Sequence, residues 1–201
     1  MRLLVVFCHP SRESFGAAVF DTACRTLRAA GHDVRVRDLY REEFEPVLSE
    51  QEWSDYLPHT QAIIDKHPEH IDDLKWAEGL LVIYPTWYYG PPAMLKGWLE
   101  RVWLPGIAFE VADARLRRTK GRLGHIRLFA GITTSGSPWW WIRLIRDPGR
   151  SLWTRGLRPL FSPKCKVIWL QLYDMNNSTE KDRTGFLARV ERTLQRIPVR
   201  P

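Results

Sequence analysis

The chain has 201 residues, of which 44% are hydrophobic and 26% charged, a balance typical of a soluble globular protein that folds as one domain over residues 1–201. The net charge of +7 raises the question of acidic partners. The basic residues are spread along the chain, however, and the densest cluster, residues 115–122, matches no nucleic-acid-binding motif. We therefore expect no nucleic-acid partner.

Cysteine usage and hydropathy indicate the compartment. The three cysteines, Cys8, Cys24 and Cys165, are odd in number and lack metal-ligand spacing, which predicts a reducing, cytoplasmic setting and no metal site. The apolar start of the chain is too short for a signal-peptide core. The longest uncharged run, residues 79–95, is interrupted by a Gly-Pro-Pro cluster, so we expect no membrane span.

Predicted strands and helices alternate along the chain. Two apolar runs, 2–8 and 79–84, predict buried strands, the first of them covered on both faces. The alternating segment 33–39 predicts a strand nearer the sheet edge, and 126–134 and 166–172 are the fourth and fifth predicted strands. Helical spacing covers 15–30, 60–77 with an interruption at Pro68, 92–104 with Pro92 as its first residue, and 180–196. Residues 40–57 read as irregular, and the tryptophan-rich section before the last strand reads as partly helical.

This alternation predicts an α/β fold with a doubly wound, five-stranded parallel sheet, order 2-1-3-4-5, and helices on both faces. In such sheets ligands bind beyond the carboxyl ends of the strands, where the winding direction switches. The loops after the first, third and fourth strands are therefore the candidate binding loops.

The first of these loops, "HPSRESF", precedes a helix. Free backbone N–H groups at the helix start, together with Ser14 and His9, can bind a phosphate. Equally, Ser11 or Ser14 simply caps the helix. The dinucleotide fingerprint and the P-loop are both absent.

The second loop, "YPTWYYGPP", combines three prolines with four aromatic residues. Trp87, Tyr88 and Tyr89 offer flat walls with polar tips, which suit a planar heteroaromatic ring. A hydrophobic plug or a dimer contact explains the loop equally well. The third loop, "TTSG", adds hydroxyl and backbone donors from Thr133 to Gly136.

The segments "HPSRESF", "YPTWYYGPPAMLKGWLERVW" followed by "GIAF", and "TTSG" resemble the flavodoxin-like NAD(P)H:quinone oxidoreductase family. That family also includes the ancillary flavoprotein subunits of glutathione-gated potassium efflux systems. The resemblance implies a bound flavin, FAD or FMN, and two-electron hydride transfer from NAD(P)H to a quinone-like acceptor by a ping-pong mechanism. It also implies a homodimer.

The resemblance assigns the cofactor-binding residues by position. The phosphate side would be held by His9, Ser14 and Phe15. The ring would be lined by Pro85, Thr86, Trp87, Tyr88 and Tyr89. The polar edge or ribityl chain would be contacted by Thr133, Thr134, Ser135 and Gly136.

Two positions depart from the family pattern. A Tyr and a His that follow the third loop in animal members are replaced, at about those places, by Trp141 and Asp147, so the catalytic residues stay unassigned. Residue 16 is Gly where the animal members have Asn, which leaves FMN open beside FAD. The missing pair and the basic, tryptophan-rich region 139–158 support an alternative, a flavin-binding regulatory subunit that docks on a membrane transport protein. A one-electron carrier is disfavoured by the basic charge.

Overall fold

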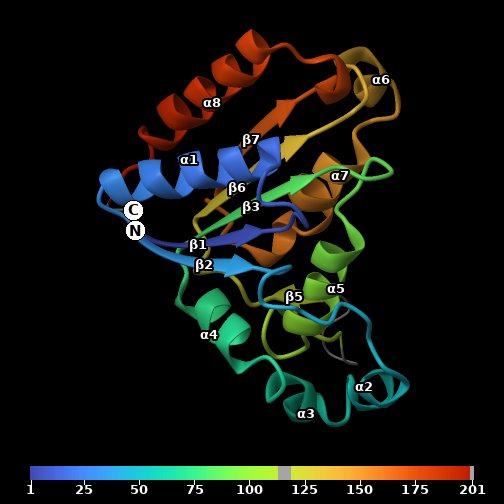
Figure 1. Ribbon diagram of the computed structural model, residues 1–201. Helices are drawn as coiled ribbons and strands as arrows, with labels where there is room; N and C mark the ends of the chain where they lie inside the picture. Colours follow the sequence, from blue (N-terminus) through green and yellow to red (C-terminus); the bar gives the residue numbers. More distant parts are fainter. Residues whose placement is uncertain (113–118, 200–201) are drawn as a thin grey trace.

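The computed structural model describes residues 1–112 and 119–199 (Figure 1). Its main sheet is parallel, with the strand order β2-β1-β3-β6-β7. The strands are β1 (Arg2–Phe7), β2 (Asp33–Asp38), β3 (Gly79–Pro85), β6 (Leu128–Thr134) and β7 (Lys166–Leu172). These are the five predicted strands in the predicted order 2-1-3-4-5. The alternating strand β2 lies at an edge, as its pattern indicates.

The alternation of side chains along each strand builds two cores. In β1, Leu3, Val5 and Phe7 belong to one buried cluster, and Leu4 and Val6 belong to the other. Each buried aliphatic side chain of this size stabilises the fold by about 1.5–3 kcal/mol. A strand buried on both faces therefore reads as the continuous apolar run that the sequence shows.

One face of the sheet is covered by α1 (Phe15–Ala29) and α8 (Glu180–Leu194), which pack together (Figure 1). Ser14 caps α1 by accepting the Ala17 N–H at 3.1 Å. After α1 the chain turns at Gly31, whose φ of 84° is left-handed and suits glycine. Thr179 caps α8 with a capping box.

The other face is covered by α4 (Pro68–Trp76) and α5 (Ala93–Val102), with α3 (Thr60–Ile64) before them. Pro68 begins α4, as its missing N–H favours. Pro92, predicted as the first helical residue, is the N-cap of α5, so the helix begins one residue later, at Ala93. Trp98 on α5 is fully buried and donates from Nε1 to His70 Nδ1 at 3.2 Å.

Two elements were not predicted. Residues 40–57, expected to be irregular, contain α2 (Glu50–Asp55), which begins at a Ser49–Glu52 capping box. Glu52 is buried and binds Arg101 and Lys66. A small antiparallel pair, β4 (Phe109–Glu110) and β5 (Lys120–Gly121), lies outside the main sheet. Of the predicted basic cluster 115–122, residues 115–118 lie outside the described residues.

The tryptophan-rich section is partly helical, as predicted, and divides into several short pieces. They are α6 (Trp139–Leu144), α7 (Pro148–Ser151), the π-helical turn η1 (Leu152–Gly156) and the 3₁₀ turn η2 (Arg158–Leu160), with a further 3₁₀ turn η3 (Met175–Asn177) after β7. Within residues 1–112 and 119–199, every helix is too short or too polar to cross a membrane. Over the same ranges, His, Cys, Asp and Glu form no group of three that could hold a metal ion.

Candidate functional site

The three candidate loops meet at the carboxyl edge of the sheet, because β1, β3 and β6 are adjacent and parallel. Two cavities lie there and share Thr86 and Gly136, so they adjoin. The larger, about 400 Å³, is lined by His9, Ser14, Phe15, Gly16, Pro85, Thr86, Trp87, Thr134, Gly136, Met175 and Asn176. The smaller, about 260 Å³, is lined by Thr86, Tyr88, Tyr89, Ser135, Gly136 and Ser137. Eleven of the twelve residues expected from the sequence line one cavity or the other.

The first loop supplies donors from the backbone rather than from serine hydroxyls. The Ser14 hydroxyl donates to Ser11 O at 2.8 Å and accepts the Ala17 N–H, so it is engaged as the helix cap. The N–H groups of Phe15 and Gly16, in the first turn of α1, donate to no acceptor among the described residues. Backbone groups of this kind, at the positive end of a 15-residue helix, favour an anion.

His9 stands beside these amides. Its Nδ1 lies 3.0 Å from both the N and the O of Ser11. With the proton on Nε2, Nδ1 accepts the Ser11 N–H and the Nε2–H can donate to a ligand. Burial lowers the pKa of His9, which favours this neutral form.

The second loop is a two-residue turn between Trp87 and Gly90, whose backbones exchange two hydrogen bonds of 3.0 Å. Both central residues, Tyr88 and Tyr89, have left-handed backbones, with φ of 48° and 65°. Asn and Gly usually occupy these positions, because a side chain with Cβ costs roughly 1–2 kcal/mol there. Tyr88 is also fully exposed, at 102%. A strained turn that presents an exposed ring is typical of a functional site.

The strained turn is supported by the segment after β6. Trp141 Nε1 donates to the Tyr89 hydroxyl at 3.0 Å. Gly149 of α7 packs against the same residue, and a Cβ added to it would lie 2.8 Å from Tyr89 O. Asp147, whose own φ is 44°, caps α7 by accepting the Arg150 N–H at 3.1 Å. Trp141 and Asp147, at about the places of the missing Tyr and His, therefore position the turn and its support.

The third loop is tied to the second. The Thr86 N–H and hydroxyl both donate to Thr134 O, at 2.8 and 2.9 Å. Ser135 Oγ accepts the Ser137 N–H at 3.2 Å, which folds the loop over the cavity edge. The Gly136 N–H has no acceptor among the described residues. A Cβ at Gly136 would lie 3.1 Å from Asn176 Nδ2, so the loop also packs closely on the segment after β7.

Thr133 is the expected residue that reaches neither cavity. It lies on the Phe129 side of β6, is 2% exposed, and its Oγ1 has no hydrogen-bond partner among the described residues. Its interior position follows from the two-residue period of a strand. The sequence analysis counted Thr133 both in the fourth strand and in the third loop, and the structure places it within the strand, which ends at Thr134 as predicted.

Four lining residues were not predicted: Gly16, Ser137, Met175 and Asn176. Met175 and Asn176 follow β7, a strand whose carboxyl end lies at the same edge because it is parallel to β6. The sequence does carry that signal, since any loop after a parallel strand near the switch point reaches this edge.

Comparisons with known proteins identify the family to which the chain belongs. Residues 1–144 match the family model described as a flavodoxin-like fold. The guinea pig (Cavia porcellus) protein named NAD(P)H dehydrogenase [quinone] 1 is 30% identical over 151 residues, which cover 68% of this chain and 54% of that protein. The human ribosyldihydronicotinamide dehydrogenase [quinone] is 25% identical, over 98% of this chain and 91% of that one.

A solved structure, NAD(P)H:quinone oxidoreductase from Methanothermobacter marburgensis, superposes with a TM-score of 0.81 at 26% identity, over 98% of this chain and 99% of that one. The chain spans about half the length of several curated relatives that it matches. The family model covers well over half of the chain, and the five-stranded order agrees with it. The resemblance seen in the three loops is thereby confirmed, and the chain belongs to the flavodoxin-like fold family, with relatives named as NAD(P)H:quinone oxidoreductases.

Proposed function

We propose that the chain binds a flavin, FMN or FAD, at the carboxyl edge of its sheet and transfers hydride from NAD(P)H to quinones or similar acceptors by a ping-pong mechanism. The observation that carries this proposal is the meeting of three loops at two adjoining cavities, with backbone donors on one side and tyrosine rings on the other. The family membership and the names of the relatives support it.

The donor set fits the parts of a flavin. The free N–H groups of Phe15 and Gly16, with His9 Nε2–H, suit the phosphate. The rings of Tyr88 and Tyr89, on the strained turn, suit contact with a flat heteroaromatic ring. That contact would bury ring area that is exposed in this structure. The free Gly136 N–H suits the polar edge of that ring.

When bound, a flavin supplies the two-electron chemistry, accepting hydride from the nicotinamide and passing it to the acceptor. The chain contributes binding, orientation and electrostatics. Gly136 N–H can stabilise negative charge that develops at the polar edge of the ring. Trp141, at about the place of the family's Tyr, donates to the Tyr89 hydroxyl, which keeps its own proton free to donate. Asp147, at about the place of the His, caps α7, so solvent and Tyr89 are the proton sources that this site offers.

The absorption spectrum of the purified protein tests the proposal first. A flavin spectrum is expected, and chromatography of the heat-released cofactor separates FMN from FAD. A steady-state assay with NADH, NADPH and a benzoquinone then tests the reaction. Protein that stays colourless after flavin is added would refute the proposed cofactor.

The second candidate is a flavin-binding regulatory subunit of a membrane transport protein, which would place the chain in the cytoplasm. Its supporting observation is α6, where Trp140 and Leu144 are 62% and 67% exposed next to the cavities. A homodimer would cover the same surface, and we propose it as the default assembly. Flavin reduction by NAD(P)H without turnover of any acceptor would favour the regulatory role, and size-exclusion chromatography with light scattering tests the dimer.

A further inference from the structure

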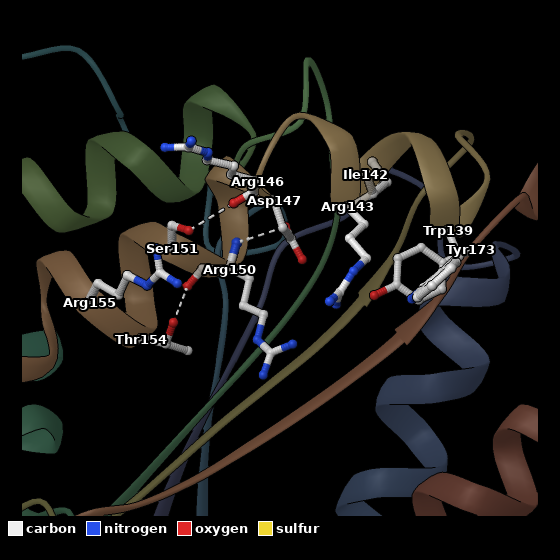
Figure 2. Close-up of a pocket in the computed structure, with 10 residues that line it drawn as sticks. All are labelled: Trp139, Ile142, Arg143, Arg146, Asp147, Arg150, Ser151, Thr154, Arg155 and Tyr173. Atoms are coloured by element: carbon white, nitrogen blue, oxygen red, sulfur yellow. Dashed lines mark hydrogen bonds between the residues drawn. The ribbon is translucent and has the colours of Figure 1, made fainter.

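A third cavity, of about 720 Å³, lies beside the candidate site (Figure 2). It is formed by α6, α7, the π-helical turn η1 and the residue that follows β7. Its lining residues are Trp139, Ile142, Arg143, Arg146, Asp147, Arg150, Ser151, Thr154, Arg155 and Tyr173. Four of the ten are arginines and one is acidic, so the cavity is strongly positive.

These arginines lack carboxylate partners. Elsewhere, arginines that line the fold pair with acids, such as Arg37 with Asp73 at 2.6 Å and Arg122 with Glu110 at 2.8 Å. None of the four cavity arginines forms an ion pair within the described residues. Other unpaired arginines, such as Arg25 on α1, lie on exposed helix surfaces. Guanidinium groups that face one cavity without ion-pair partners repel one another, and a bound anion relieves that repulsion.

Two of the four face a common space. In Figure 2, Arg143 from α6 and Arg150 from α7 extend into the cavity from neighbouring helices, while Arg146 points away from it. Trp139 and Tyr173 form the wall on the other side of Arg143. Asp147 is the one carboxyl present, and its Oδ1 already accepts the Arg150 N–H. A planar guanidinium on each side suits a phosphate, and the aromatic wall suits a purine.

This cavity lies near the proposed flavin site in the chain, although the two share no lining residue. Ser137 lines the small cavity, and Trp139, two residues later, lines this one. The intervening segment is fixed, because Asp174 N–H donates to Ser137 O at 3.0 Å. Trp141 joins α6 to the Tyr89 ring. A dinucleotide whose nicotinamide lies on the tyrosine turn can therefore extend along α6 to the arginines.

We propose that the arginine cavity binds the 2′-phosphate of NADPH through Arg143 and Arg150, with the adenine against Trp139 and Tyr173, so that NADPH is the preferred electron donor. This inference rests on the proposed oxidoreductase function and adds to it the identity of the donor. The chemistry that this site requires is recognition of a phosphate dianion by two guanidinium groups.

Calorimetric titration of the flavin-loaded protein with 2′,5′-ADP and with 5′-AMP tests the site without turnover. The two probes differ by the 2′-phosphate, and 2′,5′-ADP is expected to bind at least about tenfold more tightly, the value of one or two charge-assisted hydrogen bonds. Arg143→Gln and Arg150→Gln are each expected to weaken the affinity for 2′,5′-ADP about tenfold. Arg25→Gln, the matched control on α1, is expected to leave it unchanged. The ratio of kcat/KM for NADPH to that for NADH is expected to fall about tenfold in the two cavity variants alone.

The outcomes separate the two levels of inference. Quinone turnover with equal use of NADH and NADPH, unaffected by either cavity variant, overturns the donor inference and leaves the oxidoreductase function standing. Arginine-dependent binding of 2′,5′-ADP in a protein without turnover supports the site and refutes the enzyme function. Equal binding of 5′-AMP and 2′,5′-ADP overturns the role of the 2′-phosphate. Sedimentation with phosphatidylglycerol vesicles that depends on Arg143 and Arg150, without 2′,5′-ADP binding, assigns the arginines to lipid headgroups and overturns the proposal.

Discussion

Replacing Tyr88 by Asn is expected to stabilise the flavin-free protein and to weaken flavin binding. Tyr88 has a left-handed backbone, is fully exposed and makes no side-chain hydrogen bond to the described residues. The substitution therefore removes little packing and relieves part of a strain of roughly 1–2 kcal/mol, because Asn tolerates this conformation better than Tyr. A net gain of about 1 kcal/mol raises the melting temperature of a chain this size by about 2–4 °C.

The cost falls on the ligand. If the Tyr88 ring lies against the flavin, its removal forfeits an aromatic contact of about 1 kcal/mol together with buried apolar area, so the flavin Kd rises about tenfold. Differential scanning calorimetry of the flavin-free protein measures the first effect, and flavin titration by fluorescence quenching measures the second.

Glu43 provides the matched control. It is exposed, has a φ of 49°, and lies on the connection after β2, outside the candidate site. Glu43→Asn is expected to give a similar rise in melting temperature with unchanged flavin affinity. Two results contradict the reasoning: a Tyr88→Asn variant that is no more stable while Glu43→Asn is, or one that retains flavin as well as the wild type.

The remaining predictions concern the support of the site and two buried titratable groups. Gly149→Ala is expected to displace Tyr89, whose carbonyl oxygen lies 2.8 Å from the new methyl position, and so to lower flavin occupancy; flavin absorbance per protein measures it, and unchanged occupancy contradicts it. Burial raises the pKa of Glu52, but hydrogen bonds from Ser49, Arg101 and Lys66 outweigh it and lower the pKa to about 2. Glu52→Gln leaves Arg101 buried without its partner and is expected to cost about 3 kcal/mol in urea unfolding at pH 7, whereas a loss under about 1 kcal/mol contradicts this. Burial, with the charge of Arg37, lowers the pKa of His70 from 6.5 to about 4, so the neutral form stabilises the fold above pH 6.5 and that stability is lost as the pH falls toward 4. His70→Gln is expected to flatten the pH dependence of unfolding in that window.

The sheet could be predicted from the sequence because its three central strands, β1, β3 and β6, are buried on both faces. An apolar run such as residues 79–84 has no polar side that would suit a surface helix. Five predicted strands that alternate with helices are compatible with few topologies. The meeting of the loops followed directly, since parallel strands end at one edge. Helix α2 was missed although its Ser49–Glu52 capping box is visible in the sequence, because the box precedes no apolar periodic run.

The interior of the site was less predictable, because it depends on conformation rather than composition. Two adjacent tyrosines do not signal a left-handed two-residue turn, for which Asn-Gly is the usual pattern. The sequence left open whether Ser14 binds a phosphate or caps the helix; in the structure it caps α1, and the Phe15 and Gly16 amides are the donors left free. The arginine cavity forms only when α6 and α7 fold onto the end of β7, so its four basic residues appear in the sequence as scattered charges.

The segment from α6 to α7 therefore serves two purposes that substitutions can separate. Trp141 and Gly149 hold the strained turn, whereas Arg143 and Arg150 line a cavity on the same segment. If the turn binds the flavin ring and the cavity binds the donor phosphate, then loss of the arginines leaves flavin occupancy intact, and crowding at Gly149 leaves 2′,5′-ADP binding intact. The two defects together lower turnover by more than either alone, because the donor must reach both places at once. A single surface for one partner would instead lose both properties with either substitution.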